Sequence, residues 1–320
     1  MPVNAMRLRL SPSDIGLFLL VAVATFWAVN ALQGSGVARF STTSTDARWG
    51  AGYMPNLKVV DQNGKSYRFY DDLIKNKRVV VNFIYTSCSQ ICGLVTSRMA
   101  VLQDKLGDSV GSDYHMYSIT VDPEHDGPAE LKRHADAFNA KPGWLFLTGD
   151  PEDIRAISDK LGERSKSLDD HRQDILLGDD IRQNWSRDSV FGDLDGLALT
   201  IHAMNPEVDR DQLLQRASVA DMQVVELAPG QALFARMCSS CHSIGGGVRV
   251  GPDLNGVVRK RDRAWLTGFI SRPDKMFAAR DPLALELDAH FPAVTMPALG
   301  LSEKDAGDVI AYLEMRSSKP

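Results

Sequence analysis

The sequence predicts an exported protein in three parts: an N-terminal transmembrane helix, an α/β domain and an all-α domain. Three observations lead to this prediction. An uncharged apolar stretch lies near the N-terminus, strand and helix patterns alternate through the middle of the chain, and a CxxCH motif lies among helical patterns near the C-terminus. With 320 residues, 44% hydrophobic and 24% charged, the chain is long and apolar enough for two globular domains.

Charge and composition exclude some classes of partner. The formal net charge is -5, so no basic footprint for nucleic acid is present, and no low-complexity block or internal repeat occurs. We place four segments along the chain: a cytoplasmic stub with the membrane anchor at 1–34, a tether at 35–52, the α/β domain at 53–226 and the all-α domain at 227–320.

The N-terminal segment has the pattern of a membrane anchor. Arg7 and Arg9 precede Ile15–Leu32, a stretch without charge that is close to the lower limit of about 17 to 25 residues for a spanning helix. Arginines before the span predict a cytoplasmic N-terminus and two periplasmic domains on a single span of a bacterial inner membrane. A cleaved signal peptide is the alternative. Either way the globular part is exported, where disulfides and covalent haem attachment are possible.

The middle of the chain alternates between strand and helix patterns. Val79–Tyr85 reads as a buried strand, residues 92–106 as a helix, and "YHMYSITVD" and "GWLFLTG" as further strands. Pro128 opens a helix, and Asp150 is the expected N-cap of another. "DILL" and "IRQNW" follow as a hairpin. A strand, a Cys-bearing helix start, a βαβ unit and a closing hairpin together predict a thioredoxin-like domain. The stretch that follows, "NPEVDRDQLLQRAS", predicts a peripheral helix.

The C-terminal part contains Cys238, Cys241 and His242 in "MCSSCHSIGGG". In an exported chain, CxxCH is the attachment signature of a c-type haem, in which two thioethers hold the porphyrin and the His binds the iron. The alternative is a thioredoxin-type CxxC, but that motif needs a strand before it, and "GQALFARM" reads as a helix.

A haem that carries electrons needs a second axial ligand. Met296 is the predicted ligand, because it lies in a proline-flanked loop before a final amphipathic helix. Met276 and Met315 are the competing methionines, and His290 is a further alternative.

The C-terminal part resembles class I cytochrome c domains. The resemblance rests on CxxCH, on "GPDLNGV" after it and on "MPALGLSEKDAGDVIAYL" near the C-terminus. It implies that the Pro252 carbonyl orients the His242 imidazole. Trp265 is expected either at the haem edge or as an ordinary core residue.

Cys88 and Cys92 remain after the haem motif takes the other two of the four cysteines. A disulfide over so short a loop stabilises little as a staple. Cys88 precedes a helix whose N-terminal amides favour its thiolate, and Cys92 lies one turn further on. Two soft thiolates on one face suit Cu(I) or a reversible disulfide. Zinc is disfavoured, because its structural sites take four ligands.

A third copper ligand would be one of seven histidines. His171, in "SLDDHRQDILLG", precedes the hairpin at the sheet edge that faces the Cys-bearing helix start in a thioredoxin fold. The other histidines are expected to pack, to lie at the surface or to lack a partner motif; they are His115, His125, His134, His202 and His290. Taken alone, a histidine in an Asp-rich loop is more often exposed to solvent than bound to a metal.

Three stretches of the middle domain resemble the Sco (SenC) family of copper chaperones: "NFIYTSCSQICGLVTSRMAVLQDKLG", "YSITVDPEHDGPAELKRHADAF" and "GWLFLTGDPEDIRAISDKLG". In that family a CxxxC and a distal His bind copper for the CuA centre of cytochrome c oxidase. The resemblance implies Cys88, Cys92 and His171 as copper ligands, with the two cysteines also a redox thiol pair. The sequence departs from the family at Gly93, where a proline is usual, and in the strand after His171.

The sequence leaves three functions open. The first is a copper chaperone for the CuA-carrying oxidase subunit, with a fused haem c for electron transfer and with other periplasmic copper or electron carriers as partners. The second is a thiol:disulfide oxidoreductase that acts on oxidase cysteines without bound copper. The third is a membrane-anchored electron carrier. Because Met/His ligation raises a haem's potential and protein dithiols lie at roughly -120 to -270 mV, electrons are expected to run from dithiol or Cu(I) to haem.

Overall fold

The computed structural model describes residues 49–317, except 89–90, 209–210, 212–226 and 292–293. The predicted anchor, nearly all of the tether and most of the predicted peripheral helix after Asn205 lie outside the described residues. Within the part of the chain that is described, no helix is long and apolar enough to cross a membrane.

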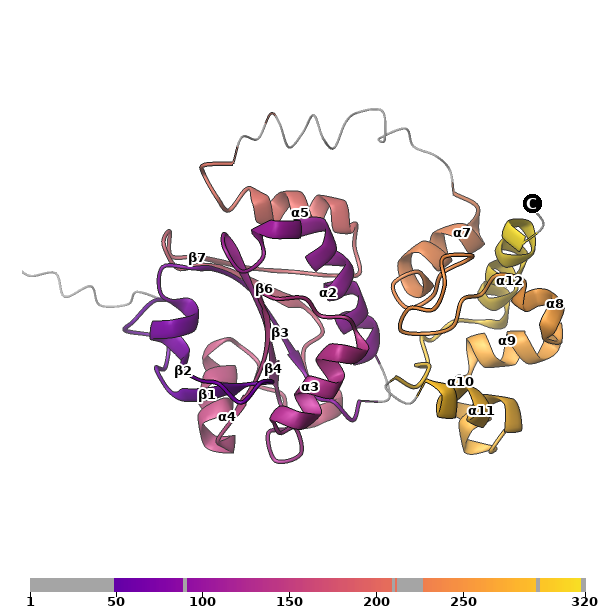
Figure 1. The fold of residues 1–320 in the computed structure, drawn as a ribbon, viewed down its shortest axis with the longest axis horizontal. Helices are drawn as coiled ribbons and strands as arrows, with labels where there is room; N and C mark the ends of the chain where they lie inside the picture. The colour runs from indigo at the N-terminus through magenta and orange to yellow at the C-terminus, as the bar shows by residue number, and fades with distance from the viewer. Residues whose placement is uncertain (1–48, 89–90, 209–210, 212–226, 292–293, 318–320) are drawn as a thin grey trace, which may run out of the picture. The chain divides into compact units, whose positions relative to one another are not determined.

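A seven-stranded mixed sheet forms the first domain, in the order β2-β1-β5-β4-β3-β6-β7 (Figure 1). Its centre is parallel, with β3 paired to β4 and β4 to β5, while the outer pairings are antiparallel. The strands are β1 (Lys58–Asp61), β2 (Ser66–Arg68), β3 (Arg78–Ile84), β4 (Tyr114–Thr120), β5 (Trp144–Gly149), β6 (Ile175–Asp179) and β7 (Asn184–Asp188). β3 is buried almost throughout because its run "RVVVNFI" faces helices on both sides.

Alternation along β3 divides the core between the two faces of the sheet. Val80 packs with the helices on one face, whereas Val79 and Val81 pack with the elements on the other. The first face is covered by α2 (Cys92–Leu106), α3 (Pro128–Ala137) and α5 (Leu194–His202). The second face is covered by the π-helical η1 (Phe69–Ile74) and by α4 (Pro151–Lys160). Short 3-10 turns complete the domain, namely η2 (Gly107–Ser109) and η3 (Leu168–Asp170).

Local signals in the sequence explain several element boundaries. The helix predicted over residues 92–106 is α2, α3 begins at Pro128, and the Asp150 side chain accepts a hydrogen bond from the Glu152 amide at 2.9 Å to cap α4. The predicted hairpin is β6 and β7, in which Gly178 pairs with Trp185. A Cβ at Gly178 would lie 2.3 Å from the Trp185 ring, so only glycine allows this cross-strand approach.

The second domain is helical over its described residues from 227 on, as predicted. Its elements are α7 (Pro229–Leu233), the π-helical η4 (Phe234–Cys238), α8 (Val257–Lys260), α9 (Arg263–Ser271), α10 (Pro273–Ala278), α11 (Pro282–His290) and α12 (Glu303–Ser317). Phe234 packs with Val309 and Leu313 of α12. A Cβ at Gly230 would lie 1.9 Å from the Asp308 carbonyl oxygen, so α7 and α12 cross in backbone contact.

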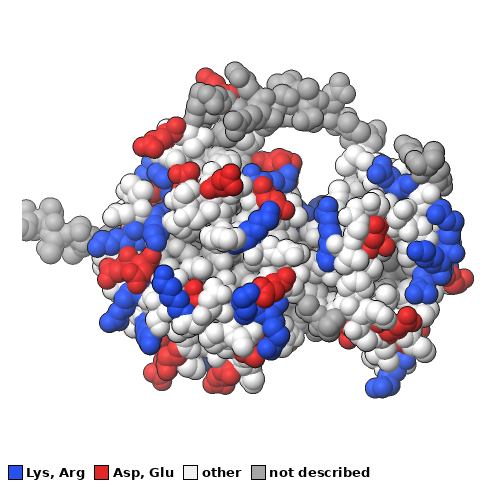
Figure 2. Space-filling view, in the orientation of Figure 1, with Lys and Arg blue, Asp and Glu red and all other residues white. Residues whose placement is uncertain are grey.

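Charged side chains of both signs are interspersed over the α/β domain on the face that Figure 2 shows. Several form exposed pairs within one helix, such as Lys132 with Asp136 and Arg133 with Glu130. Such pairs contribute little to stability, because water and salt screen them. The sheet and its two apolar layers therefore hold the first site in place.

Candidate functional site

The first cysteine pair lies where β3 passes into α2. Cys88 follows the strand in a turn, with its amide donating to the Tyr85 carbonyl at 3.3 Å, and Cys92 is the first residue of α2. The two sulfurs are joined in a disulfide. Cys92 is buried and Cys88 is half-buried, so the pair can be reached by solvent or a partner from the Cys88 side.

His171 lies beside this disulfide. Its Nε2 is 3.4 Å from the Cys92 sulfur, although 79 residues separate the two in sequence. Its Nδ1 is 2.6 Å from the Leu168 carbonyl oxygen and therefore carries the ring proton of the neutral imidazole. The Tyr85 ring packs edge-on against the imidazole, with centroids 5.3 Å apart. The unprotonated Nε2 thus lies beside the cysteine pair.

Asp126 fixes the loop that carries Cys88, and sequence reasoning did not identify it. The carboxylate is buried and accepts from the Thr86 amide at 3.0 Å, from the Thr86 hydroxyl and from the Thr120 hydroxyl at 2.6 Å. These bonds tie the start of the cysteine loop to the end of β4. The only sequence signal was an acidic residue in a loop, and that pattern is typical of exposed side chains.

The three predicted copper ligands lie together, and the form of the protein described is the oxidised one. Both sulfurs are held in the disulfide, and no group of three or more His, Cys, Asp or Glu among the described residues has the arrangement of a formed metal site. The separation of 3.4 Å between Cys92 Sγ and His171 Nε2 nevertheless fits two ligands of one ion, for which bonds of about 2.3 and 2.0 Å are typical. Soft sulfur with imidazole suits Cu(I). The ligand roles remain predictions.

The other histidines of the first domain have partners other than the cysteines. His134 is buried against Phe138 with Thr96 Oγ1 3.3 Å away, and burial lowers its pKa to about 4. Burial, with the charge of Lys77 as a smaller cause, also lowers the pKa of His115 to about 4. His125 is exposed and pairs with Asp122, and His202 packs edge-on against a tyrosine.

Cys238 and Cys241 lie in a different environment. Both are half-buried thiols at the wall of a cavity in the helical domain. Desolvation by the surrounding protein raises the pKa of Cys238 to about 12 and also raises the pKa of Cys241. A CxxC pair that reacts as thiolate has a lowered pKa instead. A thioether carries no charge, so this desolvation does not oppose covalent attachment of a haem.

His242 is held in one tautomer. Its Nδ1 donates to the Pro252 carbonyl oxygen at 2.9 Å, as the resemblance to cytochrome c implied, and burial lowers its pKa. A Cβ at Gly251 would lie 2.5 Å from His242 Cε1, so the backbone passes directly against the ring. The neutral imidazole keeps the lone pair of Nε2 available for a metal.

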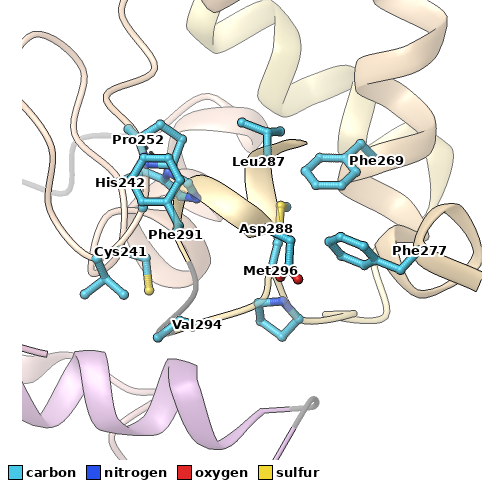
Figure 3. A pocket seen from close by; sticks show the side chains of 13 residues that line it. Cys241, His242, Pro252, Phe269, Phe277, Leu287, Asp288, Phe291, Val294 and Met296 are labelled. Carbon is cyan, nitrogen blue, oxygen red and sulfur yellow. Dashed lines mark hydrogen bonds between the residues drawn. The ribbon is translucent and has the colours of Figure 1, made fainter. Parts of the chain in front are cut away.

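His242 and Met296 line the same two hollows, and Figure 3 shows the smaller one from close by. The larger hollow contains about 1170 Å³ of empty space, part of it open to solvent. Most of its wall is apolar, as in a cofactor pocket. The apolar lining includes Leu254, Val257, Leu266, Phe269, Ile270, Leu287, Leu299, Val309 and Leu313. A large flat apolar group with its metal between an imidazole and a thioether fits these walls.

The competing axial ligands lie elsewhere. Met315 is half-exposed on α12, and Met276 is not among the residues that line these hollows. His290 Nδ1 contacts the Glu286 carbonyl oxygen at 2.8 Å within its own helix. Trp265 lines the larger hollow while its indole N–H donates to Asp281 at 3.1 Å. The ligand assignment of Met296 stays a prediction.

Two family models match parts of the chain. Residues 46–178 match the SCO1/SenC family model, and residues 227–317 match the cytochrome c family model. The chain therefore contains a SCO1/SenC domain over residues 46–178 and a cytochrome c domain over residues 227–317. The first cysteine pair and His171 fall within the SCO1/SenC match, and CxxCH and Met296 fall within the cytochrome c match.

Curated relatives match the SCO1/SenC domain. The SCO1 protein homolog of Bacillus subtilis is 36% identical over 90 residues, covering 28% of this chain and 45% of that protein. The SCO2-like protein of Rickettsia felis is 30% identical over 106 residues, covering 33% of this chain and 49% of that protein. The chain thus spans about half the length of the curated relatives it matches.

Solved structures of Sco proteins are similar to part of the chain. ScoI of Bradyrhizobium japonicum with copper bound is 25% identical at a TM-score of 0.40, covering 46% of this chain and 96% of that one. Yeast Sco1 with copper bound is 19% identical at a TM-score of 0.40, covering 52% of this chain and 100% of that one.

Proposed function

We propose that the SCO1/SenC domain binds one copper ion through Cys88, Cys92 and His171 and delivers it to the CuA centre of cytochrome c oxidase. The observation that carries the proposal is the distance of 3.4 Å between His171 Nε2 and the Cys92 sulfur. Cys92 and His171 lie 79 residues apart in sequence, yet the unprotonated Nε2 lies beside the Cys92 sulfur. Copper is the cargo of this reaction.

The disulfide makes uptake depend on the redox state. In the oxidised form neither sulfur is a thiolate, so only His171 is free to bind a metal ion. Two-electron reduction opens the Cys88–Cys92 bond, and the N-terminal amides of α2 then favour the Cys92 thiolate. In the neutral ring the Leu168 carbonyl keeps the proton of His171 on Nδ1, so Nε2 carries the lone pair that binds copper.

Copper stoichiometry tests this function. The reduced full-length protein is expected to bind one Cu(I), and His171→Ala is expected to lose this binding in competition with a Cu(I) chelator. His134→Gln is the matched control, because it removes a histidine outside the site and is expected to bind copper like the wild type. Unchanged copper binding in His171→Ala would contradict the proposed ligand set.

A second candidate function is thiol:disulfide exchange with oxidase cysteines. The disulfide, with Cys88 half-buried and open to attack, favours it. Exchange needs no imidazole ligand, so His171→Ala is expected to retain disulfide exchange with a dithiol peptide while losing copper. Loss of both activities in this variant would indicate a single metal-dependent function.

The cytochrome c domain would hold a haem c by Cys238 and Cys241, with His242 and Met296 as axial ligands. When bound, the haem supplies a one-electron carrier of raised potential. We infer that it accepts the electron when Cu(I) at the first site is oxidised to Cu(II). In a stopped-flow experiment, adding Cu(I) to the reduced-dithiol protein with ferric haem is expected to produce the ferrous haem spectrum. An unchanged spectrum with both sites loaded would contradict the coupling.

The proposed site of action is the periplasmic face of a bacterial inner membrane. The support is the pair Arg7 and Arg9 before the uncharged stretch Ile15–Leu32, together with chemistry that requires export. An alkaline-phosphatase fusion after residue 52 is expected to be active, and the protein is expected to remain in membranes after carbonate washing. Release of the protein by the wash would favour the cleaved signal peptide.

A further inference from the structure

Gln173 lies two residues after His171, at the approach to β6. Its amide nitrogen is 3.1 Å from His171 Nε2 and 3.2 Å from the His171 carbonyl oxygen. Its amide oxygen is buried and has no hydrogen-bond partner. A buried carbonyl without a partner destabilises the folded state. This atom therefore needs a physical explanation.

The surrounding atoms define which way the amide faces. Turning it over would place Oε1 against the His171 carbonyl, so that two acceptors would meet. Nδ1 of His171 already donates to Leu168, so Nε2 is an acceptor and needs a donor. The Gln173 N–H therefore caps the lone pair that a metal ion would use.

We propose that Gln173 is a fourth ligand of the copper site, an amide oxygen that binds Cu(II) in preference to Cu(I). The inference rests on the proposed copper site. Rotation about Cγ–Cδ exchanges the amide nitrogen and oxygen, which brings Oε1 to about 3 Å from His171 Nε2. Adjacent ligands of one ion have this spacing when each bond is about 2.0 to 2.2 Å. The positive ion removes the repulsion between oxygens and gives the unpartnered Oε1 a partner.

The chemistry of the donors sets the preference for one oxidation state. Cu(I) is soft, and two thiolates with one imidazole satisfy it. Cu(II) favours tetragonal sites with nitrogen and oxygen donors, so a fourth ligand of amide oxygen stabilises Cu(II) more. The role of Gln173 would then change when the metal ion binds. Its N–H caps His171 without metal, and its oxygen binds the oxidised ion.

Two variants of the full-length, dithiol-reduced protein test the inference. Gln173→Leu keeps the side-chain size and removes the oxygen, whereas Gln173→Glu keeps an oxygen donor. We measure Cu(II) affinity by competition with a Cu(II) chelator and Cu(I) affinity with a chromophoric Cu(I) chelator. Gln173→Leu is expected to weaken Cu(II) at least tenfold and Cu(I) less than threefold, with a changed Cu(II) hyperfine pattern in electron paramagnetic resonance. Gln173→Glu is expected to retain Cu(II) binding.

Other outcomes overturn the inference in distinguishable ways. Equal weakening of Cu(I) and Cu(II) in Gln173→Leu means that Gln173 only positions His171. Unchanged affinity for both ions means that its amide oxygen never reaches the metal. Failure of the wild-type protein to bind either ion removes the proposed function itself, and with it the basis of this inference. Thermal unfolding of both variants shows whether the fold is intact.

Discussion

The chain carries two cysteine pairs of similar spacing in opposite environments. Cys88 and Cys92 follow a buried strand, lie at the start of a 15-residue helix and form a disulfide beside an imidazole. Cys238 and Cys241 follow a helical segment at a cavity wall, where desolvation raises the pKa of both thiols. The surroundings of a cysteine pair therefore decide its chemistry. A helix N-terminus favours thiolate chemistry, and a desolvating apolar wall favours an uncharged thioether.

The largest expected effect is that each cysteine pair is needed for only one of the two metals. Replacing Cys88 and Cys92 with serine is expected to abolish Cu(I) binding and to leave covalent haem unchanged. Replacing Cys238 and Cys241 with serine is expected to do the reverse, because each metal depends on its own sulfurs. Copper content per protein and haem staining on a denaturing gel measure the two outcomes. Loss of both metals in either double variant would mean that the two metal sites depend on each other.

The next effect concerns how each site holds its histidine. A Cβ at Gly251 would lie 2.5 Å from the His242 ring, so Gly251→Ala is expected to displace the imidazole and weaken low-spin haem absorption. Overpacking of this kind costs about 1 to 3 kcal/mol of folding free energy. Gly307→Ala on α12 is the matched control, because a Cβ there meets nothing within 4 Å. A normal spectrum in Gly251→Ala would mean that the ring has room to move.

Local sequence was enough for much of the second site. The contact between His242 and Pro252 spans ten residues, and short-range motifs specify it. In the first domain the start of α2 at Cys92 and the N-cap Asp150 followed from equally local signals. Features that depend on nearby residues can be predicted in this way, since turn and cap chemistry determine them.

Contacts over long sequence distances were harder to predict. His171 meets Cys92 only because β6 lies beside β3 in the sheet, and without the family resemblance an Asp-rich loop predicts exposure. The burial of Asp126 depends on donors 40 and 6 residues away, at Thr86 and Thr120. Strands β1 and β2, of four and three residues, are too short to show an alternating pattern, and they were not predicted.

A smaller effect is expected in the first domain, where the buried His134 makes stability depend on pH. Burial lowers the pKa of His134 from 6.5 to about 4, so between these values the unfolded chain binds more protons. Stability is therefore complete above pH 6.5 and falls as the pH drops toward 4, by at most about 3 kcal/mol. Denaturant unfolding from pH 7 to 4.5 measures this loss.

Two variants identify the cause of that pH dependence. His134→Phe is expected to remove about half of the pH dependence, because His115, whose pKa burial also lowers to about 4, still takes up a proton on unfolding. Thr96→Val is expected to keep it, because desolvation rather than the Thr96 hydroxyl lowers the pKa of His134. A flat curve in the wild-type protein, or an unchanged one in His134→Phe, would show that His134 does not contribute to the acid sensitivity.

The smallest expected effect tests how many contacts hold His171. Tyr85 contributes its ring to the imidazole and donates its hydroxyl to Asp169 at 3.1 Å. Tyr85→Phe keeps the ring and loses a hydrogen bond of about 0.5 to 1.5 kcal/mol. Because the Leu168 carbonyl also holds His171, Cu(I) affinity is expected to fall less than fivefold in chelator competition. A loss of a hundredfold would mean that the single bond to Asp169 orients the imidazole, as the Pro252 carbonyl does for His242.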